Sequence, residues 1–175
     1  MISQKLKQAC ALGLLASCVP ALAMADAGQT VKAKLVGYNE VPAISSTGTG
    51  RFSAKIDEAA GTIAYEMIYR ALEGAASQSH IHIGQTHTSG GISAFLCTNL
   101  GNAPSASVPT CPAAEGTVAG TIQAGDVVGP NAQGIAPGEF AELVAAIRAG
   151  AAYVNVHTSK VPSGEIRGQL KSSED

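Results

Sequence analysis

Two short segments hold all four histidines of the chain. QSHIHIGQTH, residues 78–87, contains His80, His82 and His87, and YVNVHTSKVPSGEIRGQL, residues 153–170, contains His157. Imidazole nitrogen is a common ligand of zinc, copper, iron and nickel. Because side chains alternate along a strand, the two histidines of the HxH pair share one face and can reach a single ion. We therefore predict a metal site formed by these four histidines.

The same periodicity separates polar from apolar faces in both segments. Ile81 and Ile83 alternate with the HxH pair, and Val154 and Val156 alternate with the polar residues of the second segment. The apolar faces must form the core, so we expect the histidines on the outer face of the sheet. Three more polar residues share that face and are candidates to support or guide the site: Asn155, Glu165 and Arg167.

The alternative interpretation is that an outer face is simply solvated. The histidines would then be surface residues, or residues that hold loops by hydrogen bonds to nearby backbone. Residue parity lets His157 face either Arg167 or Glu165 across a hairpin, and register is not determined by parity alone. For Glu165 and Arg167 themselves, an exposed salt bridge is the simplest expectation.

Short alternating segments predict the elements that must position these residues. The chain has 20 glycines and no tryptophan, which favours a turn-rich sheet with aliphatic packing. One helix is expected near 137–149, where Phe140, Leu143, Val144 and Ile147 follow helical spacing. Many short strands with one helix indicate an all-β antiparallel sandwich or barrel. About eight strands are expected, at residues 30–37, 51–56, 62–72, 79–84, 92–97, 116–123, 151–158 and 164–171.

The first 25 residues are typical of a secretory signal peptide. Lys5 and Lys7 precede an apolar stretch, Pro20 breaks it, and ALAMA offers small residues for cleavage after Ala25. We expect an exported protein, periplasmic or extracellular. LASC, residues 15–18, is an alternative lipobox that would anchor the protein through Cys18. No later apolar stretch is long enough to span a membrane.

Residues 26–175 are expected to form a single domain with a core at about 30–171. Removal of two lysines with the signal peptide changes the formal net charge from −2 to −4. No run of basic residues is present, so a nucleic-acid partner is not expected. Two cysteines, Cys97 and Cys111, remain in the exported domain and predict one disulfide. Unpaired thiols or a thiolate metal site are the alternatives.

Three motifs closely resemble those of the CHRD domain, first described in the extracellular growth-factor antagonist chordin and common in secreted bacterial proteins. They are LVGYNEVPAISSTGTG, SHIHIG and YVNVHTSKVPSGEIRGQL, and the resemblance covers about residues 30–171. The resemblance implies a Greek-key β-barrel and says little about activity.

HIHIG is also similar to the HxH copper strand of copper–zinc superoxide dismutases. This distant likeness implies that His80, His82, His87 and His157 take the places of the four copper ligands. Arg167 would correspond to the arginine that guides superoxide. The dismutase zinc loop is missing, which argues against fast dismutation and leaves a mononuclear copper or zinc site.

These observations give three hypotheses for function. The first is a secreted metal-binding domain, with copper favoured over zinc. The second is a non-catalytic extracellular structural or interaction module with structural histidines, and the third is a superoxide dismutase-like enzyme. The sequence contains no G-x-S-x-G motif, no Cys/His nucleophile pair and no phosphate-binding glycine loop, so no catalytic residue is assigned.

Overall fold

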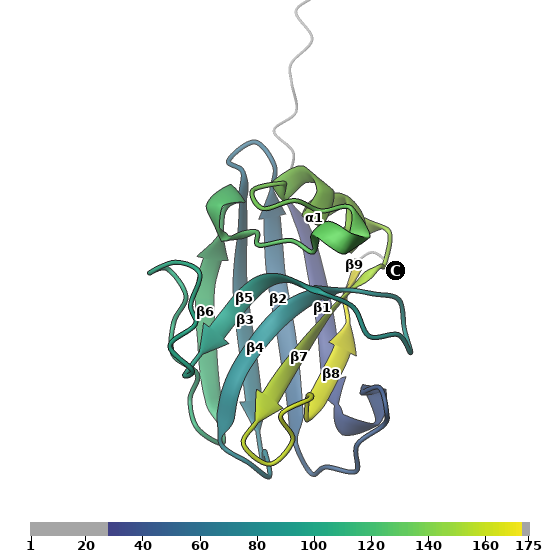
Figure 1. The fold of residues 1–175 in the computed structure, drawn as a ribbon, viewed down its shortest axis with the longest axis vertical. Coiled ribbons are helices and arrows are strands. Elements are labelled where there is room, and N and C mark those ends of the chain that lie inside the picture. Colours follow the sequence, from purple (N-terminus) through teal and green to yellow (C-terminus); the bar gives the residue numbers. More distant parts are fainter. Residues whose placement is uncertain (1–27, 173–175) are drawn as a thin grey trace, which may run out of the picture.

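The computed structural model describes residues 28–172, so the predicted signal peptide and Cys18 lie outside the described residues. The fold is all-β with one α-helix, as predicted (Figure 1). The strands are β1 (Gln29–Val36), β2 (Thr49–Asp57), β3 (Thr62–Arg70), β4 (Ala76–Ile83), β5 (Ile92–Thr98), β6 (Gly116–Ile122), β7 (Ala152–Thr158), β8 (Ile166–Gln169) and β9 (Lys171–Ser172). The helices are α1 (Phe140–Arg148) and three 3₁₀ turns, η1 (Gly37–Asn39), η2 (Ala124–Asp126) and η3 (Asn131–Gln133).

The strands form one antiparallel sheet that curls into a nearly closed barrel. Their order is β5-β4-β7-β8-β1-β2-β3-β6, and β9 adds to β1. Figure 1 shows β4, β7 and β8 in front of β1 and β2, so the two halves of the sheet face each other. The pairs β4–β7, β8–β1 and β3–β6 join strands that are distant in sequence, as in Greek-key connections. The short strand β9 was not predicted separately.

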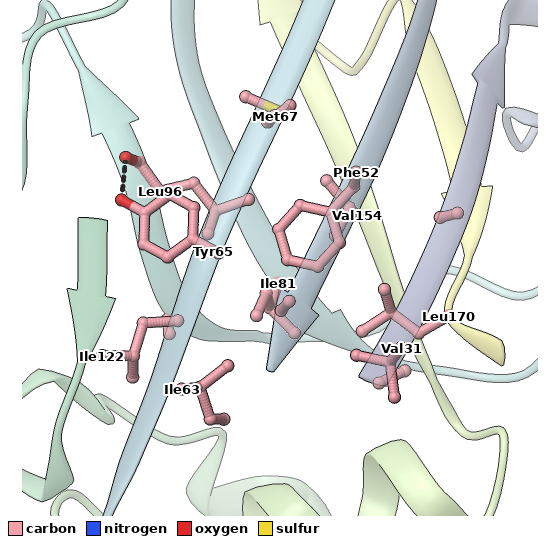
Figure 2. Packing of buried hydrophobic residues seen from close by; sticks show 14 of the residues in the cluster. Val31, Phe52, Ile63, Tyr65, Met67, Ile81, Leu96, Ile122, Val154 and Leu170 are labelled. Carbon is pink, nitrogen blue, oxygen red and sulfur yellow. Dashed lines mark hydrogen bonds between the residues drawn. The ribbon is translucent and has the colours of Figure 1, made fainter. Parts of the chain in front are cut away.

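The core lies between the two halves of the barrel. Strands β2 and β3 alternate strictly between buried and exposed residues, which matches their apolar–polar alternation. Phe52 and Tyr65 from one half pack in the interior with Ile81 and Val154 from the other (Figure 2). The Tyr65 hydroxyl donates to the Leu96 carbonyl at 2.7 Å and so satisfies its polar atom inside the core.

The helix is shorter at its start than the sequence predicts. Pro137 and Gly138 form a turn, Gly138 has a φ of 88°, and α1 begins at Phe140. The predicted apolar side chains Leu143, Val144 and Ile147 are buried. Among the described residues, no helix combines the length and the apolar character that crossing a membrane requires. The predicted disulfide between Cys97 and Cys111 is present.

Candidate metal centre

Three of the four histidines converge on one face of the β4–β7 pair. Each of His80, His82 and His157 offers one ring nitrogen, and these nitrogens all lie within 4.8 Å of one another. Strands β4 and β7 bring the rings together because they are hydrogen-bonded neighbours, with His80 opposite Asn155 and His82 opposite Tyr153. The convergence joins residues that are far apart in sequence and creates a site of three imidazoles.

Backbone carbonyls orient two of the three rings. His82 Nδ1 lies 2.9 Å from the Gly90 carbonyl oxygen, and His157 Nδ1 lies 2.9 Å from that of Pro162. A carbonyl can only accept, so each Nδ1 carries the proton and each Nε2 keeps its lone pair. A Cβ at Gly90 would lie 1.6 Å from the Ile83 oxygen, so only glycine fits this approach. Orientation of imidazoles by outer carbonyls is characteristic of metal sites.

The third ring, His80, faces His157 directly. His80 Nδ1 lies 3.2 Å from His157 Nε2, which must accept, so His80 donates in this arrangement. Two nitrogens that bind one metal at about 2.0–2.1 Å lie about 2.9–3.4 Å apart in square-planar or tetrahedral geometry. The observed separation falls in that range, so a metal ion could replace the proton between the two rings. The Nε2 atoms of His80 and His82 are buried and have no hydrogen-bond partner within residues 28–172.

The histidines are buried, which corrects the expectation of an outer, solvated face. The exposed fractions are 0% for His80, 7% for His82 and 8% for His157. Tyr153 stacks on His82 with ring centres 4.9 Å apart, and Phe95 packs edge-on against His80 at 4.4 Å. Alternation correctly predicts which face a side chain occupies, but it does not predict that large neighbouring rings and two loops cover that face.

Burial keeps the three rings neutral. It lowers the pKa of His82 to about 4 and that of His80 to about 2, with a further decrease for His80 from the neighbouring histidines. Burial also lowers the pKa of His157, although its bond to the Pro162 carbonyl acts in the opposite direction. Neutral imidazole is the form that binds metal ions, so the rings are in the ligand state at neutral pH.

The fourth histidine, His87, lies apart from this cluster. It is exposed in the loop that follows β4, and its φ of 65° is unusual for a residue other than glycine. Among the described residues, the group whose ligand atoms converge contains the other three histidines and not His87. The described arrangement therefore brings together three imidazoles and not the predicted four.

Arg167 lies beside the histidine cluster and is 2% exposed. Its guanidinium carbon lies 3.3 Å from the centre of the Tyr153 ring, and its Nη2 donates to the Gln85 carbonyl at 3.1 Å. Because β4 and β8 flank β7, Tyr153 lies between His82 and Arg167. In the observed register Arg167 faces Asn155, and the ladder ends with Val156 opposite Ile166. This register excludes Arg167 as the residue opposite His157 and agrees with the Glu165 option.

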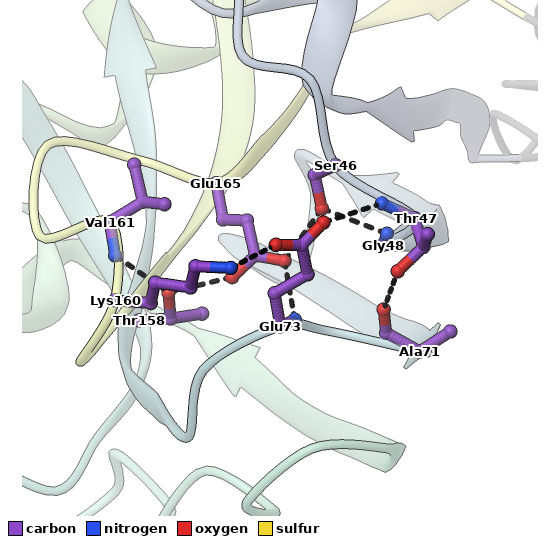
Figure 3. Close-up of polar contacts among 9 residues, drawn as sticks. All are labelled: Ser46, Thr47, Gly48, Ala71, Glu73, Thr158, Lys160, Val161 and Glu165. Atoms are coloured by element: carbon purple, nitrogen blue, oxygen red, sulfur yellow. Dashed lines mark hydrogen bonds and ion pairs between the residues drawn. The ribbon is translucent and has the colours of Figure 1, made fainter.

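Glu165 contributes to a different part of the molecule. It is fully buried and accepts hydrogen bonds from Ser46 Oγ at 2.7 Å, Thr158 Oγ1 at 2.7 Å and the Glu73 backbone N–H at 2.8 Å (Figure 3). No ion pair joins it to Arg167 in residues 28–172. The expected exposed salt bridge is therefore wrong, because the side chain turns toward the loops at the end of the barrel.

Glu40 lies beside Arg167 and was not among the predicted site residues. It is 8% exposed, and burial raises its pKa to about 7, while the Arg167 charge and the Asn155 amide lower it. Gly164 lies between the same side chains, since a Cβ there would be 2.5 Å from Glu40 Oε1 and 2.9 Å from Asn155 Nδ2. The loop motif NEVP was visible in the sequence, but only the fold shows that its carboxyl group is buried beside Arg167.

A comparison with protein families matches the CHRD domain over residues 31–170. The match covers most of the chain, and the chain belongs to the CHRD domain family. No curated protein and no solved structure matches it. Both histidine segments and the residues around them lie inside the matched region.

Proposed function

We propose that this CHRD domain binds one transition-metal ion, with copper favoured and zinc as the alternative. The ligands are His80 through Nδ1, and His82 and His157 through Nε2. One observation carries the proposal: ligand nitrogens of three buried histidines lie within 4.8 Å of one another. The carbonyls of Gly90 and Pro162, which hold two of the rings, support it further.

The chemistry of the donor set supports copper or zinc over other ions. The convergent group contains imidazoles and no carboxylate or thiolate, and Cys97 and Cys111 are joined in a disulfide. Calcium and magnesium prefer oxygen ligands, whereas imidazole suits copper and zinc. Three protein ligands also leave a position for water or a small ligand, as in open metal sites.

Family membership supports a module of the secreted type. The disulfide agrees with an oxidising compartment. We propose that residues 1–25 export the chain to the periplasm or the extracellular space, where the domain acts without a membrane span of its own. No catalytic step is part of this proposal.

Copper titration of metal-free protein tests the site directly. We expect one Cu(II) per chain and an electron paramagnetic resonance spectrum with nitrogen ligands from three imidazoles. The His80→Ala/His82→Ala double variant should bind copper about 100-fold or more weakly. Circular dichroism establishes whether the double variant is folded. The more conservative variant His82→Gln should also weaken copper binding.

His87→Ala is the matched control because this histidine is exposed and lies outside the cluster. Its copper affinity and spectrum should equal those of the unmodified protein. Unchanged affinity in the double variant would overturn the proposal. Loss of a nitrogen signal in His87→Ala would instead make His87 a fourth ligand.

A structural role is the second candidate, and one observation favours it. His82 and His157 hydrogen-bond to carbonyls in two different loops, and His80 bonds to His157, so the cluster connects loops without any metal. In this case the midpoint of thermal unfolding would be the same with copper and with chelator. The histidine variants would lower that midpoint equally under both conditions.

A further inference from the structure

A cleft lies on the outer side of β1 and β2, next to β8, β9 and the loop after β4. Its volume is about 830 Å³, within the range of small-molecule sites. Among residues 28–172 no acidic residue lines it, and five cationic residues do: Lys32, Lys34, Arg51, Arg167 and Lys171. The whole chain has a formal net charge of −2, so this concentration of positive charge is a local property.

Strand register places these cations against one another. Lys34 is directly opposite Arg51 in the β1–β2 ladder, and Lys32 is opposite Lys171 in the β1–β9 ladder. Like charges that face each other across a ladder destabilise a sheet. The ion pairs of the described residues, Arg148–Glu58 and Lys160–Glu73, lie outside the cleft. An anion bound in the cleft would relieve this repulsion.

One of the five cations is preorganised. Arg167 is buried, and its guanidinium is held by the Tyr153 ring and the Gln85 carbonyl. A guanidinium matches the two oxygens of a carboxylate, phosphate or sulfate group. Asn39 and Gln169 add neutral polar groups to the lining, and Phe52 adds apolar surface. The cleft thus combines a buried, held arginine with exposed lysines at its sides.

We propose that this cleft binds a small oxyanion ligand with two or more negative charges, such as a phosphate ester, a sulfate ester or a polycarboxylate. The site is distinct from the proposed metal centre, because the Tyr153 ring lies between Arg167 and His82. Its expected occupant is a small molecule because five cations line one cleft of about 830 Å³.

Calorimetric titration of metal-free protein with pyrophosphate, citrate and a sulfated disaccharide tests the cleft. We expect saturable binding of one ligand per chain that weakens as salt is added. The probe that binds most tightly identifies the anionic group. Lys34→Gln/Arg51→Gln should bind about tenfold or more weakly, equivalent to about 1.4 kcal/mol. It should fold at least as well as the unmodified protein, since the substitution removes a repulsive pair.

Lys55→Gln/Arg70→Gln is the matched control. Both residues are exposed on β2 and β3, neither lines the cleft, and the change in net charge is the same. Its affinity should stay within about twofold of the unmodified protein, a difference of less than about 0.5 kcal/mol. The His80→Ala/His82→Ala variant should also retain anion binding, which separates this site from the metal centre. Absence of saturable binding to all three probes, or equal weakening in both charge variants, would overturn the proposal.

Discussion

Single residues near the histidine cluster respond to pH in opposite directions. The pKa of His82 is lowered below 6.5, so the unfolded chain takes up a proton that the folded protein excludes as the pH falls. Its contribution to stability is therefore lost from about pH 6.5 downward. Glu40 has a pKa raised to about 7, so the folded protein takes up this proton first. Acidification between pH 7 and 4.5 therefore adds stability through Glu40.

Glu40→Gln removes the proton uptake by Glu40 that offsets the loss of stability from His82 at low pH, and it leaves the histidines unchanged. The fall in unfolding free energy from pH 7 to pH 5 should become larger than in the unmodified protein, by on the order of 2 kcal/mol. Urea unfolding of metal-free protein at several pH values measures this difference. Parallel pH profiles for the two proteins would show that Glu40 does not titrate in this range.

At the scale of elements, the β7–β8 hairpin ties the loops at one end of the barrel together. Its Glu165 carboxylate accepts hydrogen bonds from the loop before β2, the loop before β4 and the end of β7 (Figure 3). The neighbouring Glu73 lies on the surface and pairs with Lys160. Two acidic residues on connected loops thus have different roles because one is buried and the other is exposed.

Glu165→Ala should destabilise the domain strongly, by about 3–5 kcal/mol, because it leaves three donors without their shared acceptor. Glu73→Gln is the comparison and should change the unfolding free energy little, since exposed ion pairs contribute weakly. Chemical denaturation of both variants gives the two values. Similar losses in the two variants would contradict the structural role assigned to Glu165.

At the scale of the whole molecule, the order of the strands in the sheet creates both proposed sites. It brings the histidines of β4 and β7 together under two loops, and it gathers cations from β1, β2, β8 and β9 in one cleft. The sequence contains no basic run and therefore gave no sign of this cleft. Alternate residues on separate strands supply its positive charge. The disulfide holds a long connection against the same barrel.

Cys97→Ala/Cys111→Ala should lower the unfolding free energy by about 3 kcal/mol, the chain-entropy value for a loop of about 15 residues. The copper spectrum should stay the same, because the disulfide is not part of the histidine cluster. Urea unfolding with and without reductant measures the effect. A reductant that destabilises the double variant as much as the unmodified protein would show that the effect does not come from this bond.

The sequence by itself determined the all-β class, most strand positions, the helix residues that face the core and the disulfide. These features depend on local periodicity and, for the disulfide, on the prediction that only Cys97 and Cys111 belong to an exported domain. It also placed His80, His82 and His157 on faces opposite the core. Periodicity is a property of one strand, so such predictions need no knowledge of neighbours.

Only the tertiary structure decided which polar residues meet and how deeply they are buried. It brings three histidines together and leaves His87 apart. It turns Glu165 toward the loops and places Glu40 beside Arg167. These outcomes follow from the pairing of β4 with β7, from the register of β7 with β8, and from the loops that cover the face opposite the core. They depend on contacts between distant segments, which no local pattern specifies.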